Sequence, residues 1–329
     1  MKLQILIPQY KETDDVIKPL LDSIALQQNV PMDEIGAIIC NDGSDVYLSD
    51  EFLASYPFRI EYHKEPHRGV SATRNSCLDY ATADYVMFCD ADDMLYNMCG
   101  LWIVFREMES GFDSLVSAFV EETRRPDTKA VEYVNHDMDS TFVHGKVHRR
   151  KYLIDTNIRW NDSLTIHEDS YFNILCQNLS QNVKYCPTPF YLWKWRDDSV
   201  CRHDPKYILK TYRNMLDSNR ALVKEFMTRG MHDKAMFYTA FMIFDAYYTM
   251  NKEEWLNQEN QEYRKSTELH FAGYYKEFKD MWKAIPINDK MVISNQVRSR
   301  SVMEGMRMET VTIDTWLRHI EKMKGVEKK

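Results

Sequence analysis

The sequence predicts an α/β protein with a mostly parallel sheet flanked by helices, followed by a helical C-terminal domain. The first half of the 329 residues alternates short β-branched or aromatic runs with helical patterns, which is typical of parallel strands joined by crossover helices. Beyond Pro205 the strand patterns become rare and long helical patterns follow. We therefore expect two domains, 1–204 and 205–329, and the chain is long enough to bury a core in each.

Each predicted element follows from a local pattern. In 14–28, for example, apolar side chains recur at Val16, Ile17, Leu20 and Ile24, the spacing of one face of a helix. In the first domain we predict strands at 3–8, 34–44, 58–65, 84–93, 114–122 and 130–136, helices at 14–28, 70–82 and 101–110, and a loop at 122–129. In the second we predict helices at 206–229, 232–250, 258–283 and 309–324.

Charge narrows the range of partners. A net charge of -8 and a pI near 5.7 argue against a nucleic acid or an anionic membrane surface, because an acidic face repels both. HGKVHRRKY at 144–152 is the one basic stretch that we single out, and we interpret it as a solvated helix start rather than a binding patch. We expect no nucleic-acid partner.

Cysteines and hydropathy predict a cytoplasmic protein. The 7 cysteines are scattered and form no CxxC pair, so reduced core thiols are the expected state. The apolar stretch near the N-terminus is broken by Pro8 and is too short for a secretory signal. The nearly uncharged run 235–250 contains Asp245 and is shorter than the roughly 18 apolar residues that span a bilayer. We expect no transmembrane segment and a buried helix there.

Carboxylates follow one predicted strand directly. In DYVMFCDADD at 84–93, Asp90 and Asp92 are two residues apart, so in an extended strand end they face the same side while Asp93 points away. Such hard oxygen ligands suit Mg²⁺ or Mn²⁺ held against phosphate oxygens. The alternative is a turn that only caps the next segment.

Two further motifs belong to the same predicted sheet edge. Asp42 in CNDGSD also follows a strand, and Gly43 permits a sharp turn after it. In HRGVSATRN at 67–75, Gly69 precedes a helix that carries Arg74 in its early turns. A helix N-terminus beside an arginine suits an anionic ligand. Ligands of open α/β sheets bind where these strand ends meet.

The motifs IPQYKE, CNDGSD, RGVSATRN and CDADD resemble, in order and spacing, the family-2 glycosyltransferases. The segment 142–173, with HGK and then a Glu-Asp pair, is also similar to that family, and the resemblance covers roughly residues 1 to 200. It implies the GT-A fold and inverting transfer of a sugar from a nucleotide-diphosphate donor. His67 and Lys11 depart from the residues that the family commonly has at the donor side, so the donor can differ from the commonest ones.

The resemblance also implies roles for individual residues. The nucleotide pocket would be lined by Pro8, Gln9, Tyr10 and Glu12, with Asp42 bound to the nucleobase, Arg74 near the nucleobase and phosphates, Asp90 on the ribose and Arg196 on a phosphate. The ligands of Mn²⁺ or Mg²⁺ would be Asp92 and, as a further one, His203. On the acceptor side, Asp169 would be the general base and Glu168 would orient the acceptor. For Glu168 and Asp169 the alternative is a pair of acidic residues in the first turn of a helix.

We therefore expect a non-processive, metal-dependent enzyme that moves one sugar, from a UDP-sugar donor, to a hydroxyl of a glycan, a cell-wall or capsular polymer, or a lipid-linked acceptor. Two alternatives stay open: a catalytically weak relative that binds glycans or assembles with an enzyme, and a nucleotidyltransferase. The second would need a basic, glycine-rich loop, and IPQYKETDD is acidic without glycine. The helical domain could recognise the acceptor, form a homo-oligomer or, as the weakest reading, contact a complex at the inner face of the membrane.

Overall fold

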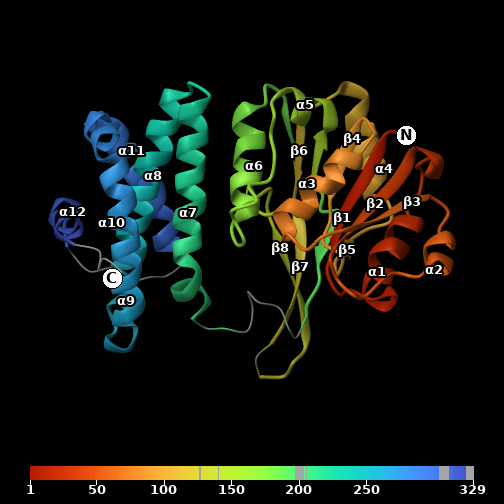
Figure 1. Ribbon diagram of the computed structural model, residues 1–329, viewed down its shortest axis with the longest axis horizontal. Coiled ribbons are helices and arrows are strands. Elements are labelled where there is room, and N and C mark those ends of the chain that lie inside the picture. The colour runs from red at the N-terminus through yellow and green to blue at the C-terminus, as the bar shows by residue number, and fades with distance from the viewer. Residues whose placement is uncertain (126, 140, 197–203, 205, 304–310, 324–329) are drawn as a thin grey trace. The chain divides into compact units, whose positions relative to one another are not determined.

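The computed structural model describes residues 1–125, 127–139, 141–196, 204, 206–303 and 311–323 (Figure 1). The chain divides into two compact units, Met1–Ser199 and Val200–Lys329. The first unit is α/β and the second is helical in its described part.

The first unit carries a mostly parallel sheet, as predicted. Within the described residues its strands follow the order β10-β6-β9-β4-β1-β2-β3, in which β1 is parallel to both β2 and β4. The strands of the unit are β1 (Leu3–Gln9), β2 (Ile35–Asp42), β3 (Arg59–Glu65), β4 (Tyr85–Phe88), β5 (Met94–Leu95), β6 (Ser114–Ser117), β7 (Phe119–Arg124), β8 (Val131–His136), β9 (Lys146–Arg149), β10 (Val183–Cys186) and β11 (Tyr191–Trp193).

Helices cover this sheet and complete its core. Ile17, Leu20 and Ile24 of α1 are fully buried in the same apolar cluster as Ile5 and Ile7 of β1, which is what the apolar face of an amphipathic helix provides. The helices of the unit are α1 (Asp14–Ala25), α2 (Asp50–Ala54), α3 (Val70–Tyr80), α4 (Gly100–Ser110), α5 (Arg150–Asp155) and α6 (Glu168–Leu179), with the 3₁₀ turn η1 (Met32–Glu34).

The predicted strand 114–122 is in fact two strands. The chain leaves the main sheet at Ala118, and β7 joins a second sheet with the order β5-β11-β7-β8. In Figure 1 the β7–β8 hairpin extends away from the rest of the first unit. Hydrophobic runs predict strands but not a change of sheet, because apolar, fully buried residues stand on both sides of the switch: Leu115 and Val116 before it, Phe119 and Val120 after it.

The interpretation of HGKVHRRKY as a solvated helix start is wrong for its first half. Residues Lys146–Arg149 form β9, which pairs antiparallel with β4 on one edge and β6 on the other. Lys146 and His148 are each only 2% exposed. Pairing on both edges buries this strand despite its charges, and helix α5 begins only at Arg150.

The second unit is built around α8, which packs against α7, α10 and α11. The sequence missed α11 and predicted the long helices on either side of it. The helices of this unit are α7 (Tyr207–Thr228), α8 (His232–Met250), α9 (Glu253–Leu256), α10 (Gln261–Ala284), α11 (Ile287–Met303) and α12 (Ile313–Lys322), with the turn η2 (Gln258–Asn260). No helix in the described part of the chain is both long and apolar enough to cross a membrane.

Candidate active site

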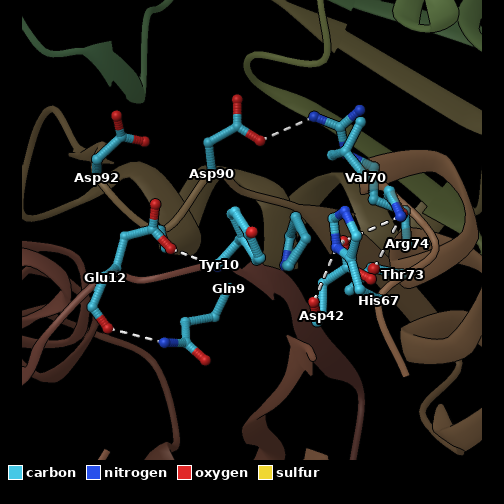
Figure 2. A pocket seen from close by; sticks show the side chains of 13 residues that line it. Gln9, Tyr10, Glu12, Asp42, His67, Val70, Thr73, Arg74, Asp90 and Asp92 are labelled. Atoms are coloured by element: carbon cyan, nitrogen blue, oxygen red, sulfur yellow. Dashed lines mark hydrogen bonds and ion pairs between the residues drawn. The ribbon is translucent and has the colours of Figure 1, made fainter. Parts of the chain in front are cut away.

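A pocket of about 340 Å³ lies at the carboxyl ends of β1 and β2, beside the residues that follow β4 and the N-terminus of α3. This is the edge of the sheet at which the sequence predicts a site, and Figure 2 shows its side chains. The pocket is lined by Pro8, Gln9, Tyr10, Glu12, Asp42, His67, Gly69, Val70, Thr73, Arg74, Asp90, Ala91 and Asp92. Twelve of these thirteen positions lie inside the motifs IPQYKE, CNDGSD, RGVSATRN and CDADD, so separate sequence motifs meet in one place.

The chain turns sharply after β1. Lys11 adopts a left-handed backbone conformation with φ 71°, and the turn brings the Glu12 carboxylate back to accept a hydrogen bond from the Tyr10 N–H at 2.5 Å. Gln9 donates its side-chain amide to the Glu12 carbonyl oxygen at 2.8 Å. Burial raises the pKa of Glu12, and the nearby Asp92 adds to that effect. The turn therefore places a carboxyl group at the mouth of the pocket.

Asp42 holds the loop that leads into α3. Its two carboxylate oxygens accept hydrogen bonds from the N–H groups of Arg68 at 2.8 Å and Gly69 at 3.0 Å. The Nδ1 atom of His67 lies 3.0 Å from Oδ2 of Asp42. The His67 ring stacks on the Tyr10 ring, with the centroids 4.9 Å apart. A contact between Asp42 and a nucleobase stays a prediction, and His67 lies beside it in the same pocket.

Gly43 is required where it stands. Its φ is +69°, and a Cβ there would lie 2.4 Å from the backbone nitrogen of His67. The glycine thus allows β2 to end directly against the 67–69 loop.

The carboxylates after β4 divide as their spacing predicts. Asp90 and Asp92 line the pocket (Figure 2), whereas Asp93 is buried and accepts hydrogen bonds from the Tyr191 hydroxyl at 2.6 Å and the Lys194 N–H at 2.9 Å. Burial and the neighbouring Asp92 and Asp90 raise the pKa of Asp93 well above its usual range. Asp93 therefore anchors the turn and leaves the other two carboxylates to face a ligand.

Arg74 connects this pocket to the Glu-Asp pair. Its guanidinium donates to Asp90 at 2.8 Å, to Glu168 at 3.0 Å and to Asp169 at 2.9 Å. The group lies 4.4 Å from the centre of the Trp160 ring and is only 3% exposed. Burial alone would raise the pKa of Asp90, but Arg74 and His144 outweigh it and hold that pKa below its usual value.

Glu168 and Asp169 are the first two residues of α6. The alternative that they are acidic first-turn residues therefore describes their place correctly, but it does not account for their shared contact with Arg74. Burial, together with Glu168 and Asp90, raises the pKa of Asp169 to about 7 against the opposing effect of Arg74. A carboxylate with such a pKa is well matched to take a proton from a hydroxyl near neutral pH.

The pocket contains suitable donors for a divalent cation. Asp90 and Asp92 present hard oxygen ligands at its wall, as Mg²⁺ and Mn²⁺ prefer. In this structure a cationic group already contacts Asp92, because the Arg196 guanidinium lies 2.8 Å from it and 3.7 Å from Glu12. The residues therefore fit the predicted metal, because both carboxylates are partly exposed at the pocket wall.

Two other metal-ligand arrangements carry less weight. Donor atoms of Asp90, Asp93 and His144 lie within 4.8 Å of one another, but Asp93 is bonded to Tyr191 and its oxygens are turned from the pocket. The predicted ligand His203 lies outside the described residues.

Sequence reasoning missed the groups that support these side chains. Trp160 lies under Arg74, and Tyr191 holds Asp93. Trp160 lies within the 142–173 segment, but the resemblance assigns neither residue a role, and each meets its partner only through tertiary packing, so no local pattern could have identified these contacts.

Comparisons with known proteins bear on the family and the fold. Residues 4–162 match the model of "Glycosyl transferase family 2". The chain is similar to the "Putative glycosyltransferase EpsH" of Bacillus subtilis (strain 168), with 21% identity that covers 68% of this chain and 69% of that protein. In fold it is similar to residues 1–349 of S. aureus TarS, with a TM-score of 0.61 and 14% identity over 94% of this chain and 97% of that one. The same TarS chain has also been solved with UDP-GlcNAc.

A mannosyltransferase of Pyrobaculum calidifontis, solved with GDP-Man and Mn²⁺, covers 97% of this chain and 84% of its own with a TM-score of 0.51 and 12% identity. These likenesses confirm the predicted fold, a GT-A-like sheet with a helical C-terminal region. The α/β unit that contains the pocket, of which residues 4–162 match the family model, belongs to glycosyl transferase family 2.

Proposed function

We propose that this protein is a metal-dependent, inverting glycosyltransferase that moves a single sugar from a UDP-sugar to a hydroxyl of a glycan, a cell-wall or capsular polymer, or a lipid-linked acceptor. The observation that carries the proposal is the Arg74 cluster. One buried guanidinium joins Asp90, at the wall of the pocket, to Asp169, a carboxylate whose pKa is raised to about 7. A donor-side group and a base are thus held in one rigid unit.

In this mechanism Asp169 accepts the proton of the acceptor hydroxyl as its oxygen forms a bond to the anomeric carbon. The bond between that carbon and the diphosphate oxygen breaks on the opposite face, and the electron pair leaves with the nucleoside diphosphate. One carboxylate base is sufficient for such a single displacement, which inverts the anomeric centre. Glu168 shares the Arg74 contact and orients the acceptor.

The donor occupies the pocket in this proposal. Pro8, Gln9, Tyr10 and Glu12 line the nucleotide side, and the remaining donor-side residues are Asp42 for the base, Arg74 near the base and phosphates, Asp90 for the ribose and Arg196 for phosphate. Asp92 would ligate Mn²⁺ or Mg²⁺, and the ion would supply positive charge to neutralise the diphosphate. The UDP donor is supported by the TarS complex with UDP-GlcNAc, and the metal by the mannosyltransferase solved with Mn²⁺.

We assign catalysis to the domain 1–204, and acceptor recognition or homo-oligomer formation to 205–329. We also place the reaction in the cytoplasm. All six cysteines among the described residues are free, and five of them are buried, which suits a reducing compartment.

Hydrolysis of a panel of UDP-, GDP- and dTDP-sugars tests this proposal. The purified protein is assayed with Mn²⁺, with Mg²⁺ and with EDTA, beside the variant Asp92→Ala. We expect one UDP-sugar to be cleaved only with metal, and the substitution to abolish cleavage. Calorimetric titration of each donor covers the case of slow hydrolysis without acceptor. If no nucleotide sugar is cleaved or bound, the proposed function is wrong.

A further inference from the structure

We propose that Lys146 and Asn173 position the catalytic carboxylate of Asp169 by holding the peptide group that joins Phe142 to Val143. The inference rests on the proposed function, because it assigns Asp169 as the base. It concerns Lys146 of the HGK triplet and Asn173, to which the family resemblance assigns no role, and each acts through the backbone rather than by touching a substrate.

Asp169 is held through both of its oxygens. Oδ1 accepts from Arg74 at 2.9 Å, and Oδ2 accepts from the Val143 N–H at 3.1 Å. Arg74 also serves Asp90 and Glu168, so its contact does not by itself define one orientation of the Asp169 carboxyl group. The Val143 N–H supplies the second point that fixes the plane of that group.

The segment that carries this N–H has no helix or strand of its own. Residues 141–145 precede β9 and consist of bends and turns, so no ladder of backbone hydrogen bonds fixes them. Side chains do so instead. Asn173 donates to the carbonyl oxygens of Thr141 at 3.0 Å and Phe142 at 2.9 Å, and the Lys146 ammonium donates to the Phe142 carbonyl and, at 3.4 Å, to that of His144.

The Phe142 carbonyl and the Val143 N–H belong to the same peptide group. Because that group is planar and trans, its C=O and N–H point in opposite directions. Two donors on the carbonyl oxygen therefore fix the direction of the N–H that reaches Asp169. Asn173 lies four residues after Asp169 in α6, so the two side chains share a helix face. Asn173 donates to the C=O of this peptide group, and Asp169 accepts from its N–H.

Lys146 is buried, and its ammonium group reaches the carbonyl groups of the turn that carries the Val143 N–H. Its side chain is 2% exposed in the central strand β9, and burial lowers its pKa to about 8 against the opposing effects of Asp139 and Asp169. It therefore remains largely protonated at pH 7. An ammonium group inside a protein is unfavourable unless its hydrogen bonds are satisfied, and here carbonyl oxygens of the 142–144 turn satisfy them.

The turn itself depends on Gly145, whose φ is +65° and where a Cβ would lie 2.2 Å from the Ser117 hydroxyl. The HGK triplet is thus one device: the glycine makes the turn, and the lysine after it holds the turn's carbonyl groups.

A double-mutant cycle tests the inference. Lys146→Met keeps the length of the side chain and removes the charge and the donors. We expect its kcat for sugar transfer to fall roughly 10- to 100-fold, the cost of a misplaced catalytic group, while donor Kd stays within about twofold. In an Asp169→Asn background we expect Lys146→Met to have almost no further effect, because the carboxylate that it positions is gone.

The controls separate positioning from general stability. Lys151→Met changes an exposed lysine of α5, 73% accessible in its pair with Asp155, and should match wild type. Lys146→Arg, which restores donors and charge, should recover most of the lost kcat. Asn173→Leu is the second route to the same cycle, should Lys146→Met fail to fold.

The outcomes are distinct for each claim. If Lys146→Met lowers the rate by the same factor in both backgrounds, or weakens donor binding in parallel, the lysine has a merely structural role and the inference is overturned, although the proposed function stands. If the wild-type protein transfers no sugar, or Asp169→Asn is as active as wild type, the proposed function or its base is wrong and the inference falls with it.

Discussion

The two sides of the pocket hold their charges differently. On the base side, Arg74 is 3% exposed and contacts three carboxylates, of which Asp169 is 20% exposed. On the side of the β1 turn, Asp92 and Arg196 are 26% and 36% exposed and lie 2.8 Å apart, and Arg196 also lies 3.7 Å from Glu12. The first is a buried network and the second is an open ion pair.

The two groups of charges differ in how easily a bound ligand could break their ion pairs. Breaking a buried ion pair leaves an uncompensated charge away from water, whereas an exposed pair exchanges partners at little cost. The Arg74 cluster, which holds the proposed base Asp169, is therefore assembled without a substrate. In the proposed function, opening of the Asp92–Arg196 pair would make the carboxylate available to a metal ion and the guanidinium to a phosphate group.

Arg74→Met should produce the largest effect. It would leave Asp90, Glu168 and Asp169 clustered without their shared cation, and we expect about 3–5 kcal/mol lower free energy of unfolding at pH 7.5. Urea denaturation followed by circular dichroism measures this. Arg68→Met is the matched control, because that side chain is 49% exposed and should cost less than about 1 kcal/mol. Equal losses in the two variants would mean that the cluster is not a buried network.

Asp169→Asn should lower kcat for transfer by at least about 10²-fold, or roughly 3 kcal/mol, since the amide cannot accept the acceptor's proton. Donor affinity should stay near that of wild type, because Asp169 does not line the pocket. Steady-state kinetics and calorimetry on the same preparation measure both quantities. If the variant loses donor affinity but keeps its kcat, Asp169 acts in donor binding and not as the base.

The raised pKa of Asp169 predicts a pH profile. The ionised form is the base, so with a pKa of about 7 the value of kcat should fall about tenfold for each pH unit below 7 and level off above about pH 8. Donor affinity, measured over the same range, identifies any part of the profile that comes from binding. An acid limb centred near pH 4 would show that Asp169 titrates like an ordinary carboxylate.

Arg196→Gln should have the smallest effect on stability, below about 1 kcal/mol, because its ion pair is partly exposed. In contrast, donor affinity should fall by roughly five- to tenfold as a charge-assisted contact to phosphate is lost. Thermal unfolding and calorimetric titration with UDP measure the two effects. A large loss of stability with unchanged affinity would make Arg196 a structural residue.

The same contrast explains how far the sequence could be used. The strands β1, β2 and β4 and the carboxylates that follow them were predictable, because apolar runs ending in Asp42 or Asp90 are local patterns. The position of β9 was not, since a lysine and a histidine in a central strand contradict every local rule and are accommodated only by pairing on both edges.

The contacts that hold Asp169, the proposed base, could not be predicted from the sequence either. Arg74 and Asp169 are 95 residues apart in the chain, and the link from Lys146 to Asp169 runs through a backbone group of a turn. Motifs identify which residue types are present at a strand end, but which of them touch depends on packing between distant segments.

The most direct test of the account is the stereochemistry of donor cleavage. With an α-linked sugar donor that the hydrolysis panel has identified, proton NMR follows the first sugar released by the wild-type protein before the anomers equilibrate. A base on one face and the diphosphate on the other predict that the β-anomer appears first, and that Asp169→Asn releases it far more slowly. The α-anomer as first product would contradict an inverting displacement by Asp169.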